Sequence, residues 1–131
     1  MEDWKIKISV LWLFTIVAGL ASGILGLLEP GAIEQIMTGE VEGMKISPEF
    51  LLLFAIIFLI PLVMAFLSLT LKDSTNRWIN IIMAIVWAGL GLTDIPMYVA
   101  KPSAYAILMW LAGIVAPILI VWYAWKSKQR V

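Results

Sequence analysis

Long apolar stretches alternate with short polar ones along this chain, and the alternation predicts four membrane-spanning helices. A helix needs about 20 apolar residues to cross a bilayer. The first stretch, from Ile8 to Leu28, contains no charged residue. We expect spans at about residues 8–28, 49–71, 76–95 and 104–125, within one integral membrane domain over residues 1–131.

Local signals place the ends and bends of these helices. Ser47-Pro48-Glu49 is a typical helix start, because Ser caps, Pro is tolerated in the first turn and Glu suits the positive end of the helix dipole. Pro61 and Pro117 fall inside the second and fourth spans and predict kinks. A secretory signal is the alternative interpretation of the first span, but its apolar core is normally shorter, about 7 to 15 residues.

The connection after the first span predicts a surface helix. Residues 32–38 place Ile33, Ile36 and Met37 on one side and polar residues on the other, before Gly39. This pattern suits a short amphipathic helix lying on the membrane surface. The predicted fold is therefore an all-α membrane protein, a four-transmembrane-helix bundle of two antiparallel hairpins with an amphipathic helix in the first outer loop.

Basic residues predict the orientation of the bundle. Lys45 and Lys101 lie on one side, and the other bases lie on the opposite side: Lys5, Lys7, Lys72, Arg77, Lys126, Lys128 and Arg130. Tryptophans and tyrosines concentrate on that same basic side, as in an interfacial aromatic belt. By the positive-inside rule, both termini are predicted to be cytoplasmic, in a multi-pass protein of the cell membrane.

Composition supports the bilayer as solvent and excludes several kinds of chemistry. The 131 residues are 63% hydrophobic and 14% charged, with a mean hydropathy of +1.01. The net charge is zero, which gives no reason to expect nucleic acid as a partner. The chain has neither cysteine nor histidine, so it lacks thiolate metal ligands and the commonest general base. We expect no metal, no cofactor and no catalytic residue.

The third span carries the candidate binding residues. Asn80, Trp87, Asp94 and Tyr98 fall on one helical stripe. Asp94 is the one carboxylate within reach of the apolar layer, and such residues are treated by default as functional hypotheses. The alternative is a structural role, in which Thr93 or Asp94 lies at the outer interface and caps a short turn that begins at Ile95-Pro96.

Two further groups suggest contacts with lipid or with other helices. Arg77 at the membrane boundary, with Trp78 fixing its depth, is a candidate for a lipid phosphate; an ordinary positive-inside anchor is the alternative. Gly19 and Gly23 form a GxxxG motif, which allows helix backbones to approach closely. We expect this motif to pack within the monomer, with a dimer contact as the alternative.

Several of these motifs together resemble a known family. They are Pro30-Gly31, Gly39, Pro61, Leu67-Ser68, Asn76-Arg77-Trp78, Asn80-Ile81 and Trp122-Tyr123-Ala124-Trp125. The chain resembles an uncharacterised family of small four-helix prokaryotic membrane proteins, a domain of unknown function. This resemblance implies an architecture without an activity, and Asp94 is not among its motifs.

We therefore expect a non-enzymatic integral membrane protein, a packing, partner-binding or lipid-binding helical bundle. Its expected partners are the lipid bilayer and either further copies of itself or another membrane protein. A small transporter or channel using the stripe of Asn80, Asp94 and Tyr98 is the alternative. A membrane enzyme acting on a lipid or quinone is a third hypothesis.

Overall fold

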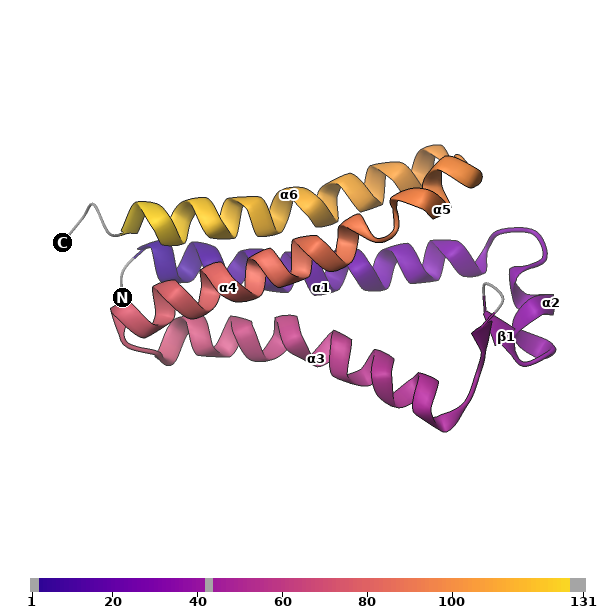
Figure 1. Ribbon diagram of the computed structural model, residues 1–131, viewed down its shortest axis with the longest axis horizontal. Helices are drawn as coiled ribbons and strands as arrows, with labels where there is room; N and C mark the ends of the chain where they lie inside the picture. The colour runs from indigo at the N-terminus through magenta and orange to yellow at the C-terminus, as the bar shows by residue number, and fades with distance from the viewer. Residues whose placement is uncertain (1–2, 42–43, 128–131) are drawn as a thin grey trace.

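The computed structural model describes residues 3–41 and 44–127, and these residues form an elongated bundle of helices (Figure 1). The elements in order are α1 (Asp3–Leu27), α2 (Ala32–Met37), β1 (Glu40–Val41), β2 (Met44–Lys45), α3 (Pro48–Thr70), α4 (Asp73–Leu92), α5 (Ile95–Ala100) and α6 (Ala104–Ser127).

Four segments in the described part of the chain are long and apolar enough to cross a membrane. They are α1, α3, α6 and the segment Asp73–Ala100, which joins α4 and α5. The predicted all-α four-helix bundle is confirmed, and the length and composition of these four segments indicate a multi-pass membrane protein. Most large apolar side chains on its sides are exposed, as expected for helices whose solvent is lipid.

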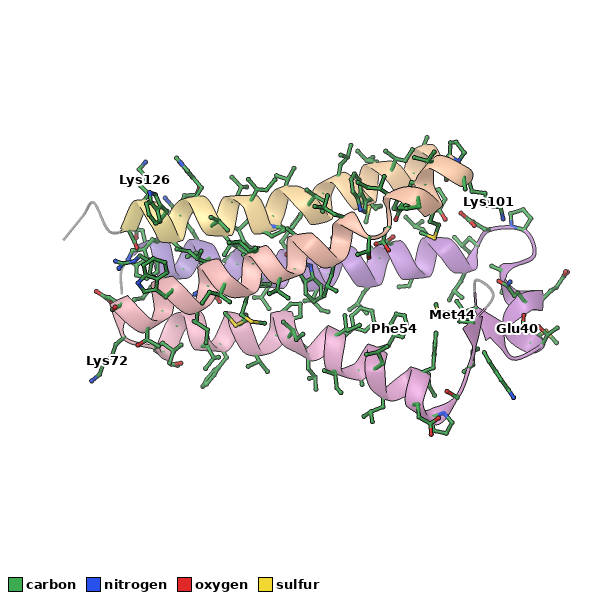
Figure 2. All side chains as sticks on the ribbon, viewed as in Figure 1. Glu40, Met44, Phe54, Lys72, Lys101 and Lys126 are labelled. Atoms are coloured by element: carbon green, nitrogen blue, oxygen red, sulfur yellow. The ribbon has the colours of Figure 1, made fainter. Side chains whose placement is uncertain are left out.

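The two ends of the bundle differ. The start of α1, the α3–α4 turn and the end of α6 meet at one end, here called the basic end (Figure 1). The opposite end, here called the loop end, carries α2, α5 and a two-stranded antiparallel ribbon that pairs Glu40 with Lys45 and Val41 with Met44. Figure 2 shows Lys72 and Lys126 at the basic end and Glu40, Met44 and Lys101 at the loop end.

The starts of α3 and α4 are capped differently. The Ser47 hydroxyl accepts a hydrogen bond from the Phe50 N–H at 3.1 Å and caps α3, as predicted. Lys72 is the N-cap of α4 and makes no side-chain cap bond, and Asp73 is already inside the helix. Gly31 and Gly39 bracket α2 with φ of 85° and 88°, a left-handed conformation that favours glycine.

The core lies toward the basic end. Its buried apolar side chains come from all four long helices and include Trp4, Ile8, Trp12, Met64, Ala65, Ile81, Ala84, Ile120 and Ala124. α1 lies between α3 and α6, and α4 packs against α6 (Figure 1). Pro61 and Pro117 are both fully buried inside continuous helices.

Candidate functional site

A buried polar network joins three helices in the basic half of the bundle. Asn80 lies at its centre: its Oδ1 accepts hydrogen bonds from Trp12 Nε1 at 2.7 Å and from Ser68 Oγ at 3.1 Å. Its Nδ2 donates to the backbone oxygen of Asn76 at 2.9 Å and to Asn76 Oδ1 at 2.6 Å. The Asn80 amide is therefore fully paired, and the network ties α4 to α1 and α3.

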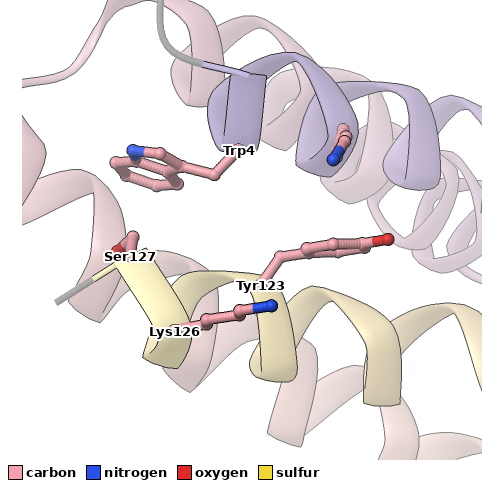
Figure 3. A pocket seen from close by; sticks show the side chains of 5 residues that line it. Trp4, Tyr123, Lys126 and Ser127 are labelled. Carbon is pink, nitrogen blue, oxygen red and sulfur yellow. The ribbon is translucent and has the colours of Figure 1, made fainter. Parts of the chain in front are cut away.

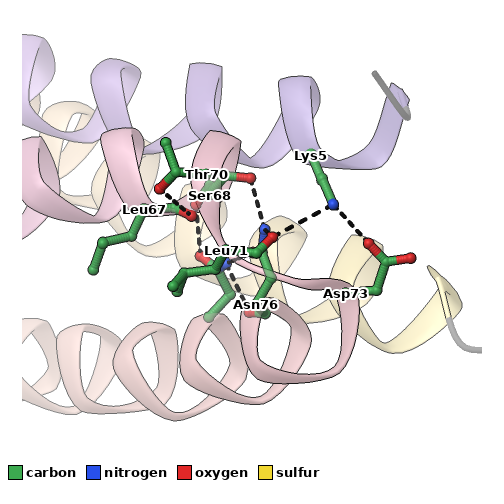
Figure 4. Close-up of polar contacts among 8 residues, drawn as sticks. Lys5, Leu67, Ser68, Thr70, Leu71, Asp73 and Asn76 are labelled. Atoms are coloured by element: carbon green, nitrogen blue, oxygen red, sulfur yellow. Dashed lines mark hydrogen bonds and ion pairs between the residues drawn. The ribbon is translucent and has the colours of Figure 1, made fainter.

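The network continues to the surface at the α3–α4 turn (Figure 4). Asn76 Nδ2 donates to the Ser68 carbonyl at 2.7 Å. Lys5 Nζ lies 2.6 Å from Asp73 Oδ1 and 3.5 Å from the Leu71 carbonyl, so the start of α1 is bound to this turn. Ser9 Oγ donates to the Ala65 carbonyl at 2.9 Å, one turn deeper. These contacts fix α1 against the basic-end half of α3.

The predicted stripe along the third span is divided by the structure. α4 ends at Leu92, and Asp94 is the N-cap of the separate short helix α5. Asn80 is fully buried in the polar network, whereas Asp94 is exposed and its side chain makes no cap hydrogen bond. Trp87 lies between them, partly buried against the core. The structure does not bring Asn80 and Asp94 together.

Tyr98 lines an apolar hollow at the loop end. The hollow has a volume of about 250 Å³ and is lined by Ile95, Tyr98, Val99, Ile107 and Trp110. The Tyr98 and Trp110 rings lie 5.8 Å apart, and Trp110 Nε1 donates to the Gly91 carbonyl at 2.8 Å. Asp94 is not part of this lining.

Aromatic rings and cations gather at the basic end. The Arg77 guanidinium lies 5.6 Å from the Trp78 ring centroid, and Trp78 meets Trp125 edge-on, with centroids 6.5 Å apart. Arg77 Nε is buried and has no hydrogen-bond partner among the described residues. The Arg77 side chain thus keeps an unused donor at the boundary of the span.

Two lysines from different helices border one small cleft beside this region (Figure 3). Lys7 of α1 and Lys126 of α6 line it together with Trp4, Tyr123 and Ser127, and its volume is about 10 Å³. Lys7 Nζ lies 5.4 Å from the Tyr123 ring, and Lys126 Nζ lies 4.7 Å from the Trp122 ring. No described carboxylate lies within ion-pair distance of either lysine, in contrast to Lys5.

Sequence reasoning singled out Arg77, Trp78 and Asn80 but missed the Lys7–Lys126 cleft and the partners of Asn80. Ser68 and Asn76 are polar residues near the ends of apolar helices, and Trp12 brings an indole N–H into the first span; these residue types were the signal in the sequence. Which of these residues meet in the interior of the bundle depends on how each helix is rotated about its axis. The sequence encodes this rotation only weakly when apolar residues surround a helix on all sides.

The described residues contain no group of three or more His, Cys, Asp or Glu side chains arranged to hold a metal ion. Their polar groups bind backbone, each other or aromatic faces.

Comparison with curated proteins and with solved structures finds no match to either. A family model does match, over residues 1–131, which is the whole chain. The resemblance noted from the Asn-Arg-Trp and Trp-Tyr-Ala-Trp motifs is confirmed: the chain belongs to the family described as a family of unknown function, DUF6326.

Proposed function

We propose that this protein is a non-enzymatic membrane protein that binds the phosphate group of anionic lipids at its basic end. The observation that carries the proposal is a set of cations without anionic partners. Lys5 is neutralised by Asp73 at 2.6 Å, whereas Lys7, Arg77 and Lys126 have no described carboxylate partner.

The chemistry of this end suits a phosphate headgroup. Two ammonium groups on facing helices repel each other, and an anion placed between them removes that repulsion. The cleft of about 10 Å³ has room for one water-sized group, such as a single phosphate oxygen. Trp78, Trp122 and Trp125 are exposed at this end of the bundle, which suits a position at the lipid headgroups.

The proposal includes the side of the membrane on which the basic end lies. Basic loops favour the cytoplasmic side of the membrane, where anionic lipids attract bases with about 1 kcal/mol per Lys or Arg. We accordingly place both termini in the cytoplasm of a prokaryotic cell and the basic end against the inner leaflet.

Binding to the detergent-purified protein tests the function. We expect phosphatidylglycerol to bind and to raise the melting temperature, and phosphatidylcholine to do so much less. The variants Arg77→Gln and Lys7→Gln/Lys126→Gln are expected to weaken phosphatidylglycerol binding by about fivefold for each base removed, at about 1 kcal/mol per base. Inorganic phosphate, run in parallel, distinguishes a lipid headgroup from the free ion.

The matched control is Lys45→Gln/Lys101→Gln, which removes two bases from the loop end. Equal binding of the two lipids, or an equal loss in this control, would contradict the proposal. Tight binding of inorganic phosphate without lipid preference would reassign the site to a soluble anion.

A further inference from the structure

The two halves of α3 are packed very differently. On the basic-end side, Pro61, Met64, Ala65 and Ser68 are buried. The Ala65 carbonyl accepts from Ser9, and Ser68 Oγ donates to Asn80, so this half is fixed to α1 and α4. From Pro48 to Ile60, here called the outer half of α3, no residue is buried.

Pro61 lies at the boundary between the fixed and the outer half. Proline has no N–H to offer to the carbonyl four residues earlier, Ile57, and its ring crowds that carbonyl. Helices bend at such positions. Beyond this point the outer half of α3 diverges from α1 toward the loop end (Figure 1).

The face of α1 opposite the outer half is flat and uncovered. A Cβ added at Gly19 would lie 3.8 Å from Phe58 Cε1, an ordinary contact. A Cβ added at Gly23 or Gly26 would meet nothing within 4 Å. The two helices therefore touch at Gly19 and separate beyond it.

A ladder of phenylalanines on α3 matches this glycine face in spacing. Phe50, Phe54 and Phe58 follow one another at steps of four, with ring centroids 4.7 and 6.3 Å apart. Phe54 lies on the side of α3 that faces α1 (Figure 2). The helices are antiparallel, so a step of four along each moves the contact from Gly19–Phe58 to Gly23–Phe54, and then to Leu27–Phe50.

We propose that the outer half of α3 closes onto α1 by bending at Pro61, packing Phe54 against Gly23 and Phe50 against Leu27. The structure is the open arrangement, in which Phe58 lies next to Gly19 but nothing lies within 4 Å of a Cβ at Gly23. Closure continues the same register without moving the polar network, because every hydrogen bond of that network lies on the other side of Pro61. This closure of α3 is independent of the proposed lipid site, which lies at the opposite end of the bundle.

The absence of native cysteine allows a direct test by disulfide trapping in membranes. Gly26→Cys with Phe50→Cys places one thiol on each helix near the last pair and leaves Gly23 and Phe54 intact. A disulfide requires Cα atoms about 4.4–6.8 Å apart, and the proposed closure is the movement that brings these two positions together. We expect most molecules to form the intramolecular bond on mild oxidation, and Gly23→Leu in this background to slow it at least tenfold.

Gly26→Cys with Leu52→Cys is the control, because Leu52 points to another side of α3 and is 61% exposed. Helix content by circular dichroism and a monodisperse elution profile in detergent establish that each variant is folded. Trapping no faster than in the control pair, or unchanged by Gly23→Leu, would overturn the closure. A disulfide-linked dimer in place of the intramolecular product would assign the glycine face to a second copy and overturn it as well.

Discussion

Asn80 illustrates how a strongly polar side chain is accommodated between apolar helices. Both of its amide protons and its oxygen are used, and its partners come from α1, α3 and α4 itself. A buried amide that loses its partners incurs the cost of desolvation without compensation. The amide therefore specifies how α1, α3 and α4 are rotated relative to one another.

Replacing Asn80 by Leu should destabilise the bundle. The substitution leaves the Trp12 indole N–H and the Asn76 Oδ1 without these partners, and we expect a loss of about 1–3 kcal/mol in the free energy of unfolding. Unfolding in mixed detergent and SDS micelles, followed by circular dichroism, measures it.

Thr70→Val is the matched control for that measurement. The Thr70 hydroxyl is exposed and bonds only carbonyls of its own helix, Phe66 and Leu67. Its replacement is expected to change the stability by less than about 0.5 kcal/mol. If Asn80→Leu were as mild as Thr70→Val, the network would have no stabilising role.

At the scale of single residues, the sequence predicted the important positions better than their partners. Asn80 and Arg77 were identified because polar groups in or beside apolar spans are unusual. That Asn80 binds Trp12 depends on a separation of 68 positions in the chain, which no local pattern encodes. Asp94 was singled out for the same reason as Asn80, with a structural cap as the alternative, and it lies exposed as the N-cap residue of α5, where the helix breaks.

At the scale of elements, Gly91 of α4 lies in the seam against Ile114 of α6. A Cβ there would lie 2.7 Å from Ile114 Cδ1, closer than real contacts allow. Trp110 of α6 also donates to the Gly91 carbonyl at 2.8 Å. The absence of a side chain thus allows the two helices to approach each other and form this bond.

Gly91→Val should push α4 and α6 apart. Overpacking of this kind costs about 1–3 kcal/mol, reduced to the extent that the Ile114 side chain can turn away. Gly89→Val is the matched control on the same helix, since a Cβ at Gly89 meets nothing within 4 Å. The same unfolding assay compares the two, and equal losses would show that the seam has no close contact at Gly91.

The elements themselves were largely predictable. Runs of apolar residues of spanning length, the Ser47 cap and the short helix before Gly39 all correspond to observed structure. The divergence of α3 was not predictable, because its outer half is apolar on every side and such a helix has no preferred face. Pro61 indicated where a bend would occur but gave no direction for it.

At the scale of the whole molecule, the grouping of the bases predicts which end lies inside the cell. Lys5, Lys7, Lys72, Arg77 and Lys126 belong to the basic end, and Lys45 and Lys101 to the loop end. A bundle oriented by this bias has the α3–α4 turn in the cytoplasm and the α5–α6 connection outside.

Single cysteines in this cysteine-free chain measure the orientation. Lys101→Cys should react with a membrane-impermeant maleimide in intact cells, and Lys72→Cys should react only after lysis. Thr38→Cys, also at the loop end, should behave as Lys101→Cys does. Labelling of Lys72→Cys in intact cells would reverse the orientation.

The polar network also has a consequence for the order in which the chain is assembled during synthesis. α4 is the least apolar of the four spanning segments, and it carries both buried asparagines. The groups on other helices that satisfy them, Trp12 and Ser68, lie on helices that precede α4 in the chain. When α4 leaves the ribosome, the helices that carry its hydrogen-bonding partners have already been made. A segment that inserts poorly alone can therefore enter the bilayer by packing against these helices.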